Sequence, residues 1–407
     1  MSAGRGRVAA SVGVQEKSDP LMLHTAIWTA GILGSAWLLT TATLAWGRIK
    51  MQKGLCKANH SSNLQEGISV VIPVRNESAR LPELFRNLAQ VQAPEGLPVE
   101  WIFVDDHSED ASWSSLHDLC SKYVLCGPVR IISAEGAGKK AAQASGVRAA
   151  RYEWILFSDA DCLWPSERLK YFQSLRTRPS CQVVLGGVAY DAATSWFFKL
   201  DLEILVQSGA ALTGLGQPIL ANGANLMCRR AVWLQHEAYL RALPVQSGDD
   251  VFLVQRVRLV SGSESVCFWD AAEWSVVTAG PRNVKEFWKQ RLRWASKTLL
   301  FPSLLGRLLA LWVWCVHVVG AGLTCAALFQ PSFWAVPAFL FWLLKWGGDL
   351  LFYKSFPRST TKLEISPLRW GLFALILPFY YAFVAPASLL SMPWESWKGR
   401  PLFTPAS

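Results

Sequence analysis

The sequence predicts an α/β domain with a mostly parallel sheet, flanked by transmembrane helices. Short β-rich runs alternate with helical stretches over residues 66–281, which is the pattern of βαβ units. One long apolar segment precedes this region and three follow it. Charged residues make up 17% of the chain, and the apolar segments are nearly free of acids. Ordinary soluble proteins carry roughly 25% charged residues, so the composition favours a membrane protein.

The N-terminal region predicts a tail and an anchor. Residues 1–20 are polar and small, and we expect disorder there. Residues 21–47 are long enough to span a bilayer, which needs roughly 20 apolar residues. A cleaved signal peptide is the alternative, because Thr43-Leu44-Ala45 offers small residues. The apolar run is too long for a signal peptide and a basic cluster follows it, so we favour a transmembrane helix.

The α/β region begins at residue 66. Strands are expected at 68–74, 99–106, 128–133 and 153–158, and helices at 77–92, 111–122 and 139–150. In a parallel sheet, ligands bind beyond the carboxyl ends of the strands. Four aspartates fall at these ends and should share one rim of the sheet: Asp105, Asp106, Asp159 and Asp161.

After residue 281 the chain is expected to approach the membrane. Residues 282–302 predict an amphipathic helix on the membrane surface, with Trp288 and Leu292 opposite Lys297. Three apolar segments follow within 303–394, and a tail covers 395–407. Basic residues border the apolar segments, which puts the α/β region in the cytosol. Counting crossings leaves the tail outside, whereas the prolines of the last segment favour a re-entrant or interfacial form with a cytosolic tail.

The net charge, the cysteines and one charged pair in an apolar segment carry further information about the protein. The net charge of +10 suggests an affinity for anions, and the position of the basic residues favours lipid headgroups rather than nucleic acid as a partner. The nine cysteines have no zinc spacing and are interpreted as reduced core residues. Lys345 and Asp349, four residues apart in an apolar segment, are either functional or a self-satisfied ion pair.

Asp159 and Asp161 form a D-x-D pair directly after the strand 153–158. A single aspartate at a strand end usually caps a helix or forms a turn. In an extended segment, however, residues i and i+2 point the same way, so both carboxylates can face one ligand. Such hard oxygen donors suit Mg²⁺ or Mn²⁺ held together with substrate phosphates. The pair alone does not decide between capping and metal binding.

Other motifs narrow the chemistry. Asp249 and Asp250 stand at the head of an apolar helix, where one is a cap and the other is a candidate general base. The turn after the first strand, PVRNES, has no glycine, which excludes a dinucleotide fingerprint. EGAGKKAA lacks the spacing of a P-loop, although Lys139 and Lys140 remain candidates to meet a diphosphate.

The order of the motifs resembles the family-2 inverting glycosyltransferases of GT-A fold. IPVRNE, VDDHSED, SDAD, GANLMCRR, GDD and QRLRW occur in this order over about 66–300 and precede membrane segments. The combination of D-x-D with Q-x-x-R-W is the specific part of the resemblance. The overall pattern is similar to the membrane-bound branch that glycosylates lipids or lipid-linked acceptors.

The resemblance implies a role for each matched residue. Asp159 and Asp161 would hold Mg²⁺ or Mn²⁺ on the diphosphate of a UDP- or GDP-sugar. Asp250 matches the general base, but Asp249 stands where the family usually has glutamate, so the choice between the two stays open. The nucleotide-sugar pocket would be lined by Pro73, Arg75, Asn76, Glu77, Asp105, Asp106, Lys140 and Asp159. The acceptor side would be shaped by Gln290, Arg293 and Trp294.

The function expected from these residues is inverting sugar transfer to a hydroxyl of a membrane lipid or lipid-linked acceptor. A carboxylate would take the acceptor proton, and the metal would neutralise the leaving diphosphate. Processive polysaccharide synthases share Q-x-x-R-W, but they usually need more membrane helices than this chain offers. A membrane-tethered nucleotide-binding scaffold is the non-enzymatic alternative, and it would have no reason to keep metal-type and base-type carboxylates together.

Overall fold

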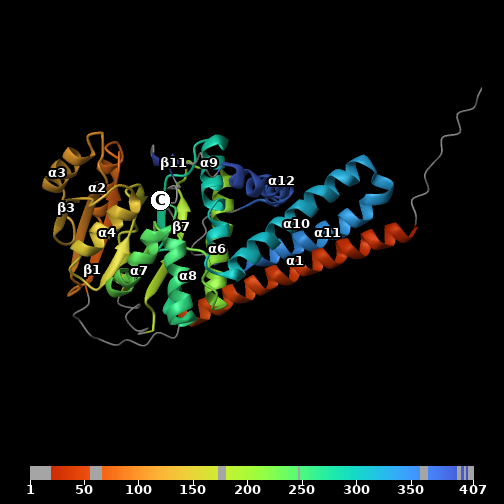
Figure 1. Cartoon of the computed structure of the whole chain (residues 1–407), viewed down its shortest axis with the longest axis horizontal. Helices are drawn as coiled ribbons and strands as arrows, with labels where there is room; N and C mark the ends of the chain where they lie inside the picture. The colour runs from red at the N-terminus through yellow and green to blue at the C-terminus, as the bar shows by residue number, and fades with distance from the viewer. Residues whose placement is uncertain are drawn as a thin grey trace, which may run out of the picture.

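The computed structural model describes residues 20–55, 67–172, 180–245, 248–357, 365–391, 396–397 and 400–401. An α/β domain occupies one end of the molecule, and long helices extend away from it (Figure 1). The predicted N-terminal tail and most of the C-terminal tail lie outside the described residues.

The main sheet has seven strands in the order β3-β2-β1-β4-β8-β6-β9. Its first four strands are parallel, and their bounds differ from the expected ones by at most one residue at either end. β8 runs antiparallel to both β4 and β6, and β9 is parallel to β6. The strands are β1 (Ile68–Val74), β2 (Val99–Asp105), β3 (Val129–Ser133), β4 (Trp154–Phe157), β6 (Val183–Gly186), β8 (Leu226–Arg229) and β9 (Val266–Trp269).

The strand order creates a switch point between β1 and β4. The chain moves from β1 outward to β2 and β3, then returns to place β4 on the other side of β1. Ligands bind outside the carboxyl ends of the strands at such a point, because the connecting helices diverge there. The predicted acidic rim therefore lies at the position that the topology reserves for a ligand.

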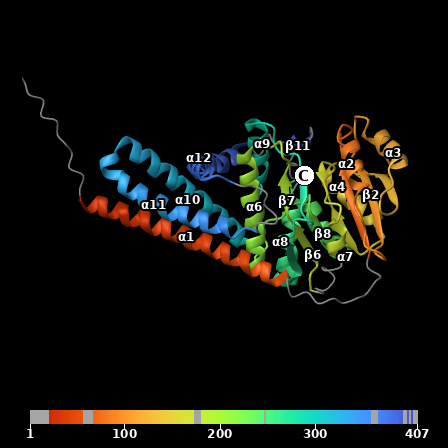
Figure 2. The same ribbon diagram turned by 180° about the vertical axis from the view of Figure 1, so that it is seen from behind.

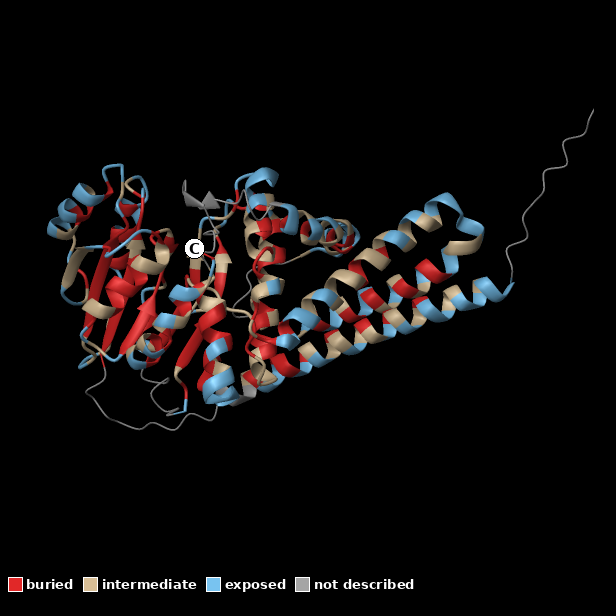
Figure 3. Ribbon diagram, in the orientation of Figure 1, coloured by how far each residue is buried: buried red, intermediate tan, exposed pale blue. Residues whose placement is uncertain are grey.

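Helices cover both faces of this sheet, and its strands are mostly buried except for the edge strand β3 (Figure 3). Leu84 and Phe85 of α2 pack in one core with Phe103, while Val147 of α4 packs in the other with Ile102. A Cβ on Gly146 would come within 2.4 Å of a Val71 methyl, so only glycine lets α4 lie this close to β1. The helices of this domain are α2 (Leu81–Leu88), α3 (Ser112–Lys122), α4 (Lys139–Ala149), α6 (Trp196–Gly214), α7 (Arg230–Ala242) and α8 (Asp249–Ser261).

A small second sheet lies beside the first, in the order β5-β10-β7. Its strands are β5 (Cys162–Leu163), β7 (Val188–Tyr190) and β10 (Val276–Thr278). β5 begins directly after Asp161 and pairs with β10, which pins the segment that carries the D-x-D pair. Cys162 is fully buried, and its thiol is free.

Four helices within the described residues are long and apolar enough to cross a membrane. These helices are α1 (Pro20–Leu55), α10 (Leu304–Phe329), α11 (Pro331–Lys354) and α12 (Pro367–Ser391). α1 lies along α11 in both views (Figures 1 and 2). At its domain end, Arg48 is fully buried, donates to Gln207 at 2.5 Å and forms an ion pair with Asp270. The first apolar segment is therefore docked on the α/β domain, as an anchor would be.

The last apolar helix differs in direction from the other three. α1, α10 and α11 run along the long axis of the molecule, whereas α12 is seen nearly end-on (Figures 1 and 2). Pro378 and Pro386 lie inside α12 without ending it. In α11, Lys345 Nζ lies 2.7 Å from Asp349 Oδ2, and Trp37 donates to the other oxygen at 2.7 Å. Lys345 and Asp349 thus form an ion pair with each other, and Trp37 ties that pair to α1.

The helix expected on the membrane surface is more buried than the sequence predicts. α9 (Val284–Ala295) starts at an Asn283 cap, whose side chain accepts from Glu286 N at 3.0 Å. It packs against α12, and it buries Phe287, Arg291 and Leu292. The sequence put Lys297 on the solvent-facing polar side, but the structure buries it in a cavity at the end of this helix.

Candidate active site

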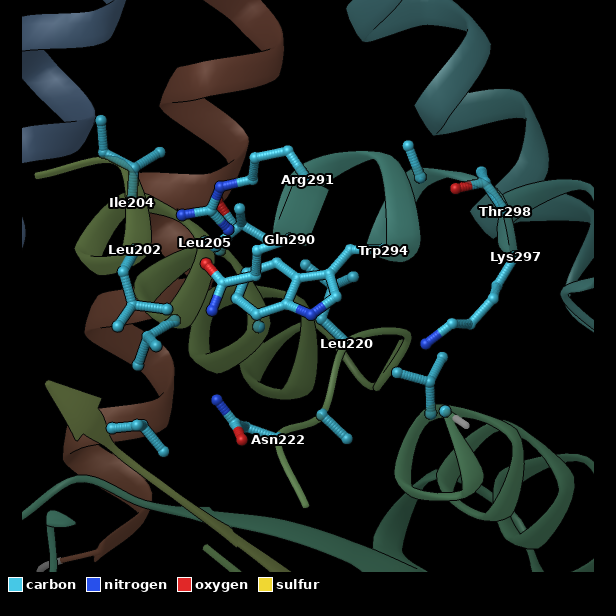
Figure 4. Close-up of a pocket in the computed structure, with 18 of the residues that line it drawn as sticks. Leu202, Ile204, Leu205, Leu220, Asn222, Gln290, Arg291, Trp294, Lys297 and Thr298 are labelled. Atoms are coloured by element: carbon cyan, nitrogen blue, oxygen red, sulfur yellow. The ribbon is translucent and has the colours of Figure 1, made fainter. Parts of the chain in front are cut away.

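A cavity of about 940 Å³ connects the rim of the sheet to the membrane helices. At the rim it is lined by Asp106, Asp159 and Asp161, and at the far end by His317, Asp349 and Tyr381. Between these ends it passes α6, α9 and the start of α10 (Figure 4). One space therefore touches both the carboxylates of the α/β domain and apolar side chains of the membrane helices.

The loops after β1 and β2 build one wall of the cavity. Pro73, Arg75 and Glu77 line it, as does Asp106. Arg75 Nη1 donates to the carbonyl oxygens of Asp106 and His107, both at 2.8 Å, which ties the two loops together. Asp106 Oδ1 accepts from Gly138 N at 2.8 Å, so this carboxylate also positions the start of α4.

Three residues predicted for the nucleotide pocket do not line this cavity: Asn76, Asp105 and Lys140. Asp105 is buried, and its Oδ2 accepts from Ser108 N at 3.1 Å. Asn76 has a φ of 52°, and its Oδ1 accepts from Glu109 N at 2.8 Å. Both side chains hold the turns that carry the cavity wall, and their contact with a nucleotide stays a prediction.

The D-x-D pair lies on the cavity side of β5. Asp161 has a raised pKa, because its partly buried carboxyl loses hydration and lies near Asp159 and Glu77. Two cations offset this crowding: Lys139 pairs with Asp159, and Arg80 Nη1 lies 3.6 Å from Asp161 Oδ2. The pair is therefore a concentration of negative charge that the chain compensates with long, movable side chains.

These donors fit a divalent cation. Both carboxylates line the same cavity, and their oxygens are the hard ligands that Mg²⁺ and Mn²⁺ prefer. Among the described residues no group of three or more acidic, histidine or cysteine side chains surrounds a single point. The chain thus offers two carboxylates, which is the number that Mg²⁺ takes when substrate phosphates complete its shell.

The two lysines at the start of α4 diverge. Lys140 Nζ lies 3.3 Å from Asp249 Oδ1 and donates to Leu240 O at 2.9 Å, outside the large cavity. Lys139 lines the cavity instead, and although burial acts to lower its pKa, Asp159, Asp250 and Asp161 together raise it. Lys139, and not the predicted Lys140, therefore lines the cavity beside the D-x-D pair.

Asp249 and Asp250 differ in their surroundings. Burial raises the pKa of Asp249 to about 6, although Lys140 acts to lower it. Both aspartates line the cavity, but Asp250 is held by backbone groups: its Oδ2 accepts from Gly223 N at 2.6 Å and its Oδ1 from Val251 N at 2.9 Å. Two backbone N–H groups therefore fix the position of the Asp250 carboxylate.

The QRLRW segment forms the opposite wall. Gln290, Arg293 and Trp294 line the cavity, and Figure 4 shows the Gln290 and Trp294 side chains extending into it. Gln290 Oε1 accepts from the Tyr190 hydroxyl at 2.6 Å. Arg291 is a residue that the sequence did not single out: it is buried, pairs with Asp201 at 2.5 Å and stacks 4.3 Å from the Trp294 ring centre. Held by Asp201, the Arg291 guanidinium packs on the face of the Trp294 ring and helps to orient it.

Comparison with known proteins identifies the domain. Residues 69–233 match the family described as Glycosyl transferase family 2. The chain carries a family-2 glycosyltransferase domain. This confirms the predicted resemblance to family 2 for residues 69–233.

Relatives of the family-2 domain include proteins named for lipid substrates. The chain is 30% identical over 149 residues to the dolichol-phosphate mannosyltransferase of Pyrococcus furiosus, covering 36% of this chain and 40% of the relative. It is 25% identical over 309 residues to the beta-monoglucosyldiacylglycerol synthase of Trichormus variabilis, covering 72% of this chain and 61% of that protein. The chain spans less than two thirds of the length of both relatives.

A solved structure shares the architecture. The mannosyltransferase PcManGT from Pyrobaculum calidifontis, solved with GDP-Man and Mn²⁺, aligns with a TM-score of 0.51 at 14% identity. The alignment covers 92% of this chain and 100% of that one. The likeness establishes the fold alone: the family-2 domain has the predicted GT-A-like α/β fold with a mostly parallel sheet, and candidate membrane helices flank it.

Proposed function

We propose that the protein transfers a sugar from a UDP- or GDP-sugar to a hydroxyl of a membrane lipid or lipid-linked acceptor, with inversion at the anomeric carbon. The observation that carries this proposal is the single cavity that joins Asp159, Asp161 and Asp250 to the apolar side chains of α10 and α12. A nucleotide sugar is water-soluble and a lipid is not, so an enzyme that joins them needs one space open to both. The names of the relatives support this choice of substrates.

The acidic rim would bind the donor. Asp159 and Asp161 would hold Mg²⁺ or Mn²⁺, and the bound ion would neutralise charge on the leaving nucleoside diphosphate. Lys139 lies beside this pair and would add a positive charge next to the diphosphate. The loop walls around Arg75 and Asp106 would enclose the nucleoside.

Asp250 would act as the general base. Its carboxylate is held by two backbone N–H groups and faces the cavity, so it can accept the proton of an acceptor hydroxyl during attack. Gln290, Arg293 and Trp294 would position the acceptor on the opposite wall. A base that faces the nucleophile directly requires no covalent intermediate, which is why we propose inversion.

The lining of the membrane half argues against a processive polysaccharide synthase. A hydrophilic polymer needs polar side chains along its path. Here α10 and α12 contribute mainly Leu, Val, Ala and aromatic side chains, which suit an acyl or polyprenyl chain.

We also propose that α12 lies in the membrane interface, with the family-2 domain in the cytosol. α12 crosses the direction of α1, α10 and α11 (Figure 1), and its outward face carries exposed Leu375, Ile376 and Phe383. A helix that enters and leaves on one side returns the chain to the cytosol, which removes the conflict between an outside tail and its Lys398 and Arg400. Protease protection of a C-terminal tag tests this in sealed vesicles whose cytosolic side faces inward. Digestion of the tag only after the vesicles are permeabilised supports the proposal, and digestion in intact vesicles refutes it.

Turnover is tested on the full chain in lipid nanodiscs. Release of UDP or GDP from their sugars would be measured with added lipid extract for the wild type, Asp159→Ala, Asp250→Asn and the exposed control Asp118→Asn. We expect Asp250→Asn to reduce turnover by about 10²- to 10⁴-fold, the usual contribution of a general base. Asp159→Ala should lose turnover and the dependence on added metal. Equal turnover in all four proteins, or a product with retained configuration, would contradict the proposed function.

A further inference from the structure

Lys297 is a buried cation with no hydrogen-bond or ion-pair partner among the described residues. It follows α9, its side chain is 8% exposed, and Figure 4 shows it extending into the cavity. A lysine ammonium has three hydrogen-bond donors. Within the part of the chain that the structure describes, no hydrogen bond or ion pair involves this ammonium. Burying a charge in this way is costly unless something pairs with it.

The ammonium lies at the N-terminus of α8. A Cβ placed on Gly248, the residue before this 13-residue helix, would come 2.9 Å from Lys297 Cδ and 3.4 Å from Nζ. Gly248 has a φ of 91°, which glycine adopts without strain. Because glycine has no Cβ, the lysine stem can lie across the helix end. A helix N-terminus carries a partial positive charge and favours anions. A cation placed there adds to the positive charge instead of offsetting it.

The nearby carboxylates are engaged elsewhere. Asp249 pairs with Lys140 at 3.3 Å, and both oxygens of Asp250 accept from backbone N–H groups. Burial lowers the pKa of Lys297 to about 8, because the pull of Asp250 compensates only part of the lost hydration and Arg293 repels the ammonium. The lysine is therefore still mostly charged at neutral pH, and an additional anion would stabilise it.

We propose that Lys297 and the first turn of α8 bind a phosphate group of a substrate. The identity of that substrate rests on the proposed function, which offers two sources. One is the diphosphate of the nucleotide sugar, since Lys139 at the donor side is close enough to affect Lys297. The other is a phosphate carried by the lipid acceptor, since Thr298, Phe301 and Gly306 continue the same cavity wall towards the membrane.

Binding measurements on the full chain in detergent distinguish these sources without turnover. The variants are Lys297→Met, Lys297→Arg and the control Lys285→Met, which removes an exposed lysine from α9. The donor probes are UDP and GDP with Mn²⁺, followed by calorimetry. The acceptor probes are dioctanoyl phosphatidic acid and the uncharged dioctanoylglycerol, followed by tryptophan fluorescence. The melting temperature of each variant shows whether it is folded.

We expect Lys297→Met to weaken the binding of one phosphate probe by about 10-fold or more, as the loss of a charge-assisted hydrogen bond would. Lys297→Arg should stay within about 3-fold of the wild type, and Lys285→Met should equal it. Weaker UDP or GDP binding assigns the donor phosphate, and weaker phosphatidic acid binding with unchanged nucleotide binding assigns the acceptor phosphate. Unchanged binding of all phosphate probes, or equal loss of dioctanoylglycerol, would overturn the proposal. A chain that binds phosphate through Lys297 but transfers no sugar would refute the proposed function alone.

Discussion

Replacing Asp249 by asparagine should stabilise the protein at neutral pH and leave sugar transfer intact. Burial raises the pKa of Asp249 from 3.8 to about 6, while Lys140 acts in the opposite direction and Asp250 adds to the rise. The folded state therefore binds this proton more tightly than the unfolded state does. The contribution of this group to the free energy of unfolding is fully present below pH 3.8 and is lost as the pH rises through 6.

At pH values above the folded-state pKa, the free energy of unfolding has fallen by about 3 kcal/mol. Asparagine has no charge to bury, so Asp249→Asn avoids the loss at pH 7.5. For a domain of this size the gain corresponds to a rise in melting temperature of roughly 6–12 °C. At pH 4 the wild-type carboxyl is largely protonated when folded, and the difference should nearly disappear.

Tryptophan fluorescence during thermal unfolding, from pH 4 to 8, measures this difference in detergent. Asp118→Asn, on the exposed side of α3, is the matched control and should leave the melting temperature unchanged. A lower melting temperature for Asp249→Asn at pH 7.5 would show that the Lys140 pair contributes more than burial costs. Turnover lost in Asp249→Asn but kept in Asp250→Asn would refute the assignment of Asp250 as the base.

The remaining predictions concern packing and the metal. Arg48→Met should leave Asp270 buried without its partner and cost roughly 3–5 kcal/mol in unfolding experiments, whereas Arg48→Met with Asp270→Leu should recover most of it. Gly146→Ala should push a methyl into Val71 and lower stability by about 1–3 kcal/mol, while Gly347→Ala, which meets open space, should change little. Chelation of divalent cations should abolish sugar transfer and leave the melting temperature within a few degrees, and added Mn²⁺ should restore activity; activity that persists in chelator would contradict the metal role of Asp159 and Asp161.

Much of the fold is readable from periodicity. The alternation of short apolar strands with helices placed β1, β2, β3 and β4 within a residue or so of their ends. The antiparallel strand β8 and the small sheet β5-β10-β7 were not predicted, because pairing between distant short segments leaves no local pattern. The direction of α12 was left open for a similar reason: its composition is apolar all round, so the sequence alone does not favour spanning over lying flat.

The candidate site was likewise predicted from the sequence only in part. The carboxylates proposed to hold a metal and to take a proton were evident from D-x-D and GDD, and the proposed acceptor wall was evident from QRLRW, since those motifs are short and contiguous. Which of two adjacent lysines faces the cavity was not evident, and Lys139 rather than Lys140 does so because α4 starts at a turn held by Asp106. Helical periodicity put Lys297 in water, but the α9 helix ends two residues before it, so the periodic rule no longer applies at that position.

The sequence by itself determined the alternating α/β domain, the apolar helices around it and the types of side chain at the strand ends. Hydrophobic periodicity and motif order are local properties of the chain, and they survive without any knowledge of packing. Only the tertiary structure decided that one cavity joins the acidic rim to the membrane helices. It also decided that Asp249 pairs with Lys140 while backbone N–H groups hold Asp250, and that Lys297 is buried in the same cavity. These outcomes depend on how α6, α8, α9 and α10 pack against one another, and packing brings together residues that lie far apart in the chain.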